Sequence, residues 1–544
     1  MSRFLLLALL AFLSTPVQAQ HSEMQMPAPK PVALLPGLGT LHHPVSTKNA
    51  EAQRFFDQGL RMTYGFNHEE AVRSFQRAAE IDPQLAMAWW GIAYALGPNI
   101  NQDVDPEHEK AAYDAVQKAL GLSEDAPANE RAYIEALATR YSNDPAADLK
   151  KLALNYKNAM GALAKKYPND LDAVTLYAES AMDLKPWKLW SPDGTPAEGT
   201  LEIIATLESV LRRNPNHPGA IHYYIHAVEA SPNPDRALRY APRLAKLMPM
   251  AGHLVHMPSH IYQRVGDFQA AAQSNVAGAA ADEAYFKATG VQGVYSMYYA
   301  HNLDFLAVAN SMNGRYADAI GAANKLVGFA QPMAAQMAML EPVLGKSLLM
   351  WERFGKWDEI SKAPQPDASA PSTLAFWHFA RGVMFARRGE IANAKAEQTA
   401  FLAAQKTVPA SAMSSLNPTS KVLAIAEKVL GARIAEAEPD DNRALQLFDE
   451  AINIEDSLVY DEPPQWFHPV REALGGFLLR RENYSAAERT FRADLEKNRL
   501  SGRSLFGLAE SLKAQKKLRA AALVQRQFAK AWKNADTQLS VAQL

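Results

Sequence analysis

Residues 475–521 read GGFLLRRENYSAAERTFRADLEKNRLSGRSLFGLAESLKAQKKLRAA, and this stretch contains two similar units. Ala487 and Ala521 lie 34 residues apart, and a glycine, Gly475 or Gly507, precedes each of them. Small residues at such positions let two helices cross closely, and a helical hairpin of this length cannot bury its apolar face alone. The stretch therefore predicts helical hairpins that stack on one another.

The same unit recurs along most of the chain. Near the start it shows as Phe55, Gly59, Ala71, Phe75, Ala78 and Pro83, and later units are marked by Ala237, Ala271, Ala319 and Ala394. The spacing resembles the tetratricopeptide repeat (TPR). The resemblance implies an all-α fold, a right-handed superhelical solenoid in which the first helix of each hairpin lines a concave groove. In such a groove the TPR family binds a peptide or protein partner.

Four blocks, GPNIN, HYYIHAVEAS, AGHLVHMPSHIYQRVGDF and HPVREALG, also resemble a group of exported bacterial TPR proteins. That resemblance implies fold and export, but no reaction. Within the solenoid we expect an N-terminal part at 49–361 and a C-terminal part at 362–544. The boundary is placed there because the insertion KAPQPDASAPS at 362–372 is rich in proline and small residues.

The first 48 residues predict export followed by a linker. Arg3 precedes an apolar run from Phe4 to Leu13, and Val17-Gln18-Ala19 supplies small residues for cleavage, so 1–19 is predicted to be a signal peptide. Residues 20–48 contain five prolines and no amphipathic period, which predicts a flexible or extended leader. The expected location is periplasmic or secreted. The chain has no cysteine, which argues against a lipoprotein anchor, disulfides and thiolate ligands.

Overall composition excludes several classes of partner. The formal net charge is −2 and 48% of the residues are hydrophobic, so no basic excess indicates a nucleic acid or an anionic membrane. Any bound metal must be held by imidazole, carboxylate or backbone oxygen. The motif His-Glu-x-x-His of zinc proteases is absent.

Histidines occur at matching positions of successive repeats. His222 and His256 lie 15 residues before the anchor alanines 237 and 271, and His226 and His260 lie 11 residues before them. His253 and His301 lie 18 residues before the anchor alanines 271 and 319. Residues spaced by three or four share one face of a helix, and packed helices lie about 8–10 Å apart. We therefore expect these six histidines to converge in the groove on a shared transition-metal ion: zinc, iron, copper or manganese.

Two carboxylates accompany the histidines. Glu229 extends the stripe of His222 and His226, and Glu179 occupies the row of His226 one repeat earlier. Trp187 and Trp190 sit in the following insertion, where they would either cover the groove or only pack the insertion.

Three functions remain open at this stage. The first is an exported scaffold that binds a protein or peptide partner and carries a metal site in its groove. The second is a metal-dependent enzyme, a hydrolase or an oxidoreductase, with Glu179 or Glu229 as the base. The third is a metal-free peptide-binding adaptor.

Overall fold

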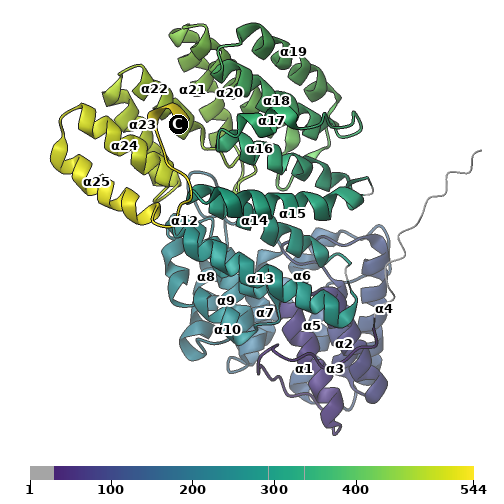
Figure 1. The fold of residues 1–544 in the computed structure, drawn as a ribbon. Helices are drawn as coiled ribbons and strands as arrows, with labels where there is room; N and C mark the ends of the chain where they lie inside the picture. The colour runs from purple at the N-terminus through teal and green to yellow at the C-terminus, as the bar shows by residue number, and fades with distance from the viewer. Residues whose placement is uncertain (1–29, 292, 336) are drawn as a thin grey trace, which may run out of the picture.

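The computed structural model describes residues 30–291, 293–335 and 337–544. The predicted signal peptide, 1–19, and residues 20–29 lie outside the described residues. The described chain is built almost entirely of helices, as the repeat predicts (Figure 1). In the first half these are α1 (Ala50–Tyr64), α2 (His68–Ile81), α3 (Ala86–Leu96), α4 (Pro106–Leu122), α5 (Ala128–Ala138), α6 (Leu149–Lys166), α7 (Leu171–Met182), α8 (Thr200–Arg213), α9 (Pro218–Val228), α10 (Leu244–Leu247), α11 (Gly252–His256), α12 (Pro258–Val265) and α13 (Phe268–Thr289).

The second half continues in the same way. Its helices are α14 (Ser296–Met312), α15 (Tyr316–Ala334), α16 (Lys346–Arg353), α17 (Trp357–Lys362), α18 (Pro371–Arg387), α19 (Ile391–Thr407), α20 (Thr419–Ala437), α21 (Asp441–Asp456), α22 (Val470–Arg480), α23 (Tyr484–Lys497), α24 (Gly502–Ala514) and α25 (Leu518–Ala531). Short 3-10 helices are η1 (Pro234–Arg239), η2 (Ala241–Arg243), η3 (Ala338–Gly345) and η4 (Val541–Gln543). Two antiparallel strands, β1 (Met413–Ser414) and β2 (Asn417–Pro418), form a small turn before α20.

Glycines at the helix crossings explain how the hairpins stack. A Cβ on Gly475 or Gly507 would lie 2.5 or 2.1 Å from the ring of Phe491, which fills the space between α22 and α24. Phe75 is placed in the same way between α1 and α3, against Gly59 and Gly91. One aromatic ring thus joins its own hairpin to the next. The packing confirms the TPR-like, all-α solenoid.

The core consists of two large parts. One hydrophobic cluster runs from Leu38 to Tyr295 and the other from Phe268 to Leu544, and they meet at α13 and α14. Figure 1 shows the same two halves, with α14 and α15 between them. The change of core therefore comes before the boundary expected at 361/362. The segment 362–372 only connects α17 to α18, because α16 packs directly on α18 and keeps the second core continuous.

The described part of the expected leader lies against the solenoid. Residues 30–48 form no helix or strand, but the Gln58 side chain donates to the Ala33 carbonyl at 2.9 Å and accepts from the Leu35 amide at 2.7 Å. Leu38 is buried, and His43 pairs with Asp172 at 2.9 Å. Extended backbone is what the prolines predict. The structure differs from a flexible leader because these side chains find partners on α1 and α7.

Within the described residues, no helix is long and apolar enough to cross a membrane.

Candidate metal centre

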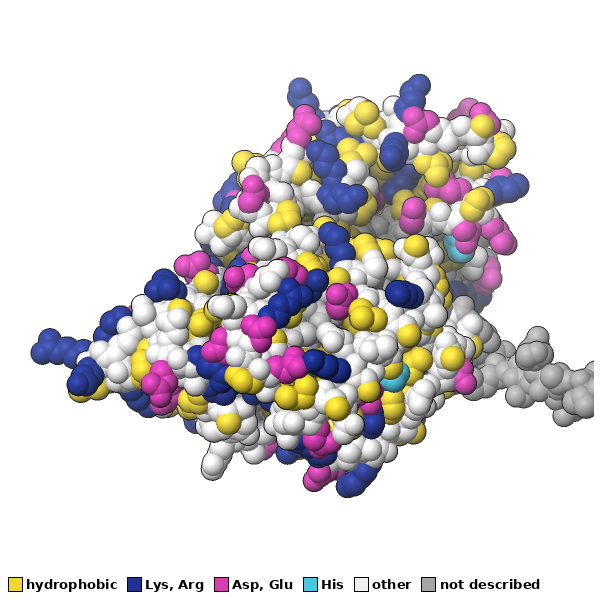
Figure 2. Space-filling model, turned by 90° about the horizontal axis from the view of Figure 1, so that it is seen from above, with side chains coloured by type: hydrophobic (Ala, Val, Ile, Leu, Met, Phe, Trp, Pro, Cys, Tyr) yellow, Lys and Arg dark blue, Asp and Glu magenta, His cyan; other side chains and the backbone are white. Residues whose placement is uncertain are grey.

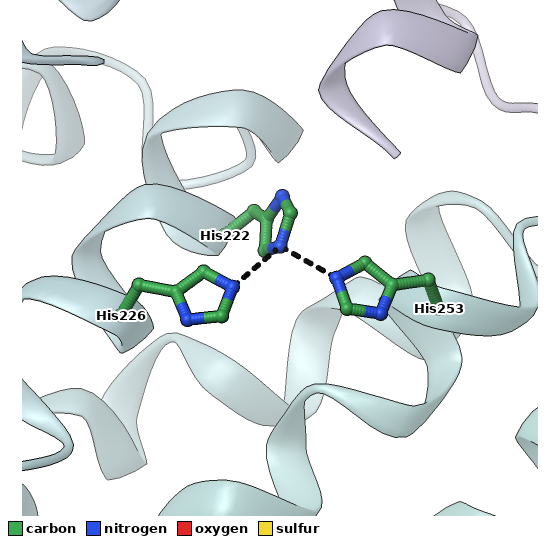
Figure 3. Close-up of side chains that lie close together, drawn as sticks. All are labelled: His222, His226 and His253. Carbon is green, nitrogen blue, oxygen red and sulfur yellow. Dashed lines mark hydrogen bonds between the residues drawn. The ribbon is translucent and has the colours of Figure 1, made fainter. Parts of the chain in front are cut away.

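Three histidines point their Nε2 atoms at one another between α9 and α11 (Figure 3). The Nε2 atom of His222 lies 3.1 Å from that of His226 and 3.1 Å from that of His253. All three rings are buried. A tetrahedral metal ion with ligand distances of about 2.0–2.1 Å sets neighbouring nitrogen atoms about 3.3 Å apart, close to the spacing here. We call these residues the first triad.

Neighbouring acceptors fix the tautomer of two rings in the first triad. The Nδ1 atom of His222 lies 2.7 Å from the Tyr64 carbonyl oxygen, and the Nδ1 atom of His226 lies 2.8 Å from a Glu229 oxygen. A carbonyl or carboxylate oxygen can only accept, so both Nδ1 atoms carry the hydrogen. Both Nε2 atoms then present lone pairs to each other. A positive ion between them removes this repulsion.

A second triad, His256, His260 and His301, repeats this arrangement. The Nε2 atoms of His256 and His260 lie 2.8 Å apart, and His301 offers a third ligand atom within 4.8 Å of both. Each triad takes its first two members from offsets 15 and 11 of one repeat and its third from offset 18 of the next. The second triad is therefore the copy of the first, one repeat later.

The predicted convergence is thus divided in two. All six histidines come together, but as two neighbouring groups instead of one group around a single ion. Between the groups, the ring centroids of His226 and His260, and those of His253 and His256, are 5.9 Å apart. The division follows from the repeat, because a third ligand taken from the next hairpin completes each group before the following one begins.

Glu229 joins the two triads from the outside. One of its oxygens lies 2.8 Å from Nδ1 of His226 and the other 2.5 Å from Nδ1 of His260. Glu462, in the connection between α21 and α22, also faces Nδ1 of His260, at 3.1 Å. A carboxylate on the far nitrogen of a metal-binding histidine fixes the ring and makes its other nitrogen a better ligand.

Burial makes most of these rings neutral. Burial and the neighbouring rings lower the pKa of His222, His253 and His256 well below the ordinary value, and that of His301 to about 3. His260 is the exception. Burial opposes its charge, but Glu229 and Glu462 outweigh burial and raise its pKa to about 10. The second triad can therefore satisfy its nitrogens with either a metal ion or a proton, whereas the first has no comparable source of positive charge.

The Asn275 side chain holds His256 as Tyr64 holds His222. Its Oδ1 lies 2.6 Å from Nδ1 of His256, and its amide nitrogen donates to the Ala271 carbonyl at 2.8 Å. That second bond orients the amide, so the atom facing His256 is the acceptor. His253 differs, because its Nδ1 atom is buried and meets no hydrogen-bond partner among the described residues.

Aromatic rings close the site where an open groove is expected from the sequence. Phe66, in the α1–α2 connection, lies with its ring centroid 4.4 to 5.9 Å from those of the first triad. Phe305 of α14 lies 5.1 to 5.9 Å from those of the second. Histidine is almost absent from the face shown in Figure 2. The α1–α2 connection and the 457–469 connection, both distant in sequence, cover the inward helix faces.

The insertion after α7 also lies beside the first triad. The Trp187 ring centroid is 5.6 Å from that of His226, and Trp190 donates from Nε1 to the Ala227 carbonyl at 2.8 Å. A small cavity of about 20 Å³ lies between Trp187, His226, Glu229 and Tyr460. A cavity of this size holds about one water molecule.

Glu179 lies elsewhere. It belongs to a buried group with Asp183 and Arg140, in which Arg140 and Asp183 form an ion pair at 3.0 Å. Burial and the neighbouring Asp183 raise the pKa of Glu179 well above its ordinary value. Within the described residues it makes no hydrogen bond or ion pair with the six histidines. The shared repeat position does not bring it to the site, because the α7 hairpin has no copy of the neighbouring ligands.

Several residues of the site gave no signal in the sequence. Glu462, Phe66, Tyr64 and Asn275 approach from connections and neighbouring helices, so no helical spacing links them to the histidines. Only Asn275 had an available signal, since it lies four residues after the anchor alanine of its hairpin and so faces the first helix.

Comparisons with known proteins show distant similarity only. No protein-family model matches the chain, and no curated protein matches it. Among solved structures, it is similar to a human IFIT1 dimer with m7Gppp-AAAA (TM-score 0.33, 14% identity, 89% of this chain and 91% of that one). It is also similar to the P58(IPK) TPR domain (0.24, 11%, 86% and 99%) and to yeast Tom70 (0.28, 12%, 90% and 100%). These likenesses transfer no function to this chain.

Proposed function

We propose that the protein is an exported, TPR-like scaffold that holds transition-metal ions in two repeat-related three-histidine centres. The first triad carries the proposal. Two of its Nε2 atoms, 3.1 Å apart, both present lone pairs, because their Nδ1 hydrogens are donated to Tyr64 and Glu229. Without a cation, one buried ring would have to take a second proton, and burial opposes that.

The ligand set narrows the metal to a borderline transition ion. Three neutral imidazoles without thiolate suit zinc, iron, copper or manganese, and magnesium or calcium would prefer oxygen ligands. Glu229 contributes one negative charge to both centres from outside the ligand set. A divalent ion in each triad is therefore partly neutralised without losing a coordination position.

The arrangement favours holding a metal over catalysis. Three protein ligands leave a further coordination position, as in catalytic zinc sites. Yet both oxygens of Glu229 are engaged by histidines, and Glu179 is in another cluster, so neither candidate base is free. The adjoining cavity of about 20 Å³ admits about one water molecule and no larger substrate.

Metal content measured on single-triad variants tests the proposal. Wild-type protein, purified without an affinity tag, is expected to carry up to two equivalents of a transition metal by elemental analysis. H222Q/H226Q should lose the equivalent of the first triad, and H256Q/H260Q that of the second. The control H108Q changes a half-exposed histidine on α4 and should keep the wild-type content.

The outcome that contradicts the proposal is equally direct. Unchanged metal content in H222Q/H226Q, with the helical circular dichroism signal intact, would favour the metal-free adaptor. One equivalent that depends only on the first triad would leave the second as a hydrogen-bonded pair with a charged His260. Export and a protein or peptide partner remain predictions from the resemblance, and fractionation and affinity capture from the producing cells test them.

A further inference from the structure

The C-terminal half encloses a cavity of about 640 Å³, separate from the histidines. Cavities of about 300–1,000 Å³ are the usual size for small-molecule sites. Its lining carries six cationic side chains, Arg353, Lys356, Arg387, Arg433, Arg480 and Arg503, against three carboxylates, Glu352, Glu472 and Asp536. The cavity therefore has a surplus of positive charge inside a partly dry space.

The arginines form a ladder built by the repeat. One comes from the first helix of each of five successive hairpins, α16, α18, α20, α22 and α24, which lie near one another in Figure 1. Three of them, Arg353, Arg387 and Arg480, lie seven residues before the buried residues Ile360, Ala394 and Ala487. Arg433 lies 11 residues before Ala444, and Arg503 lies 18 before Ala521. The offsets of 11 and 18 are those of the histidines in the first half.

Some of this cationic hydrogen-bonding capacity is unused. The Nε atom of Arg353 and the Nη2 atom of Arg480 are buried without a hydrogen-bond partner among the described residues. The Arg353 side chain is only 3% exposed. A guanidinium nitrogen can only donate, so these atoms require acceptors.

Arg387 is the least balanced of the five. Within the described residues it pairs with no carboxylate, and its Nη2 donates to the Leu544 main-chain oxygen at 2.7 Å. Arg480 donates to the same oxygen at 2.9 Å. By contrast, Arg433 and Arg480 share Glu436, and Arg353 and Arg503 share Glu472. Burial and the adjacent Arg433 and Arg480 lower the pKa of Arg387 well below its ordinary value.

We propose that this cavity binds a small multivalent anion that carries phosphate or carboxylate groups. Planar guanidinium groups bind both kinds of group with paired hydrogen bonds. An anion seated among five arginines would use the unpaired donors and offset the repulsion around Arg387. This site is independent of the proposed metal centres, since it uses a different half of the chain.

Calorimetric titration of the full-length protein tests the proposal. Inorganic phosphate and tricarballylate are titrated separately, with chloride matched to the same ionic strength. Saturable binding of phosphate alone would identify phosphate-bearing ligands, and binding of tricarballylate alone would identify polycarboxylates. We expect R387Q to bind the preferred anion roughly tenfold more weakly, since a charge-assisted hydrogen bond is lost.

The control is the next residue along the chain. R388Q removes an exposed arginine that pairs with Asp358, and it should bind the anion as the wild type does. R387Q should keep its melting temperature, because no ion pair is broken, and R387K should retain more affinity than R387Q. The proposal is overturned if neither anion binds saturably to the wild type, or if R387Q and R388Q bind alike.

Discussion

Each histidine ring offers two nitrogens, and the neighbours in this protein assign different tasks to them. His222 and His256 occupy the same repeat position, yet one Nδ1 is held by the Tyr64 carbonyl and the other by the Asn275 amide. His226 and His260 share one carboxylate, Glu229. The repeat thus reproduces the inward Nε2 atoms, while unrelated groups secure the outward Nδ1 atoms.

Glu229 provides a test at the scale of one residue. In E229Q one side-chain oxygen becomes an NH₂ group, which faces a ring N–H and forces that ring to move or to change tautomer. Loss of such an outer partner typically costs 10–100-fold in metal affinity. We expect a loss of this size in both triads, measured by competition with a chromogenic chelator.

Glu462 supplies the matched variant. It faces only His260, so E462Q should weaken the second triad and leave the first unchanged. Equal affinities for E229Q and wild type would show that Glu229 does not support metal ligands.

At the scale of elements, the close approach of α11 to α13 places two histidines. A Cβ on Gly252 would lie 1.9 Å from an Asp282 oxygen and 2.8 Å from the Gly278 carbonyl. Gly252 immediately precedes His253, and Gly278 lies against the His256 side chain. The glycine pair therefore sets the distance at which α11 presents its histidines to α9.

Substitution of Gly252 tests this contact. G252A must push α11 from α13, and overpacking of this kind costs about 1–3 kcal/mol of unfolding free energy. The control G321A lies in α15, where no atom is within 4 Å of an added Cβ, and should gain roughly 0.5–1 kcal/mol. Urea unfolding followed by circular dichroism measures both. Equal changes in the two variants would contradict the assigned role of Gly252.

Proline has a second effect on this element. Pro258 ends the regular hydrogen bonding of α11 and begins α12, because it has no amide hydrogen to donate. Met257 between them keeps helical dihedral angles, so His256 and His260 remain neighbours with ring centroids 4.8 Å apart. The predicted stripe of three histidines is confirmed across two helices instead of one.

At the scale of the whole molecule, the two halves use one design for different chemistry. Inward positions of the first helices carry histidines in the N-terminal half and arginines in the C-terminal half. The connection at 457–469 comes from the second core and brings Glu462 to the second triad. Metal binding therefore links segments that are far apart in the sequence.

Hydrogen exchange with and without metal measures this linkage. Chelation should raise amide exchange in α9, α11, α12, the α1–α2 connection and 457–469, since a ligand stabilises the segments that close over it. Helices α19, α21 and α25 should exchange as before. A uniform change along the chain, or one limited to α9, would contradict a site that spans both cores.

The sequence by itself determined the repeated fold, the six histidines and their register. A period of 34 residues with small anchors leaves few ways to bury each hairpin, and helical spacing then fixes which side chains face inward. For the same reason Glu229 could be assigned to the site from its place in the stripe, three residues after His226.

Only the tertiary structure decided the division into two triads, the closure over them and the location of Glu179. These features depend on side-chain reach and on connections such as 457–469, whose paths no local period encodes. Whether two inward side chains meet is set by packing distances of a few ångströms. Phe66 and Glu462 enter the site through such contacts, and helical spacing carries no information about them.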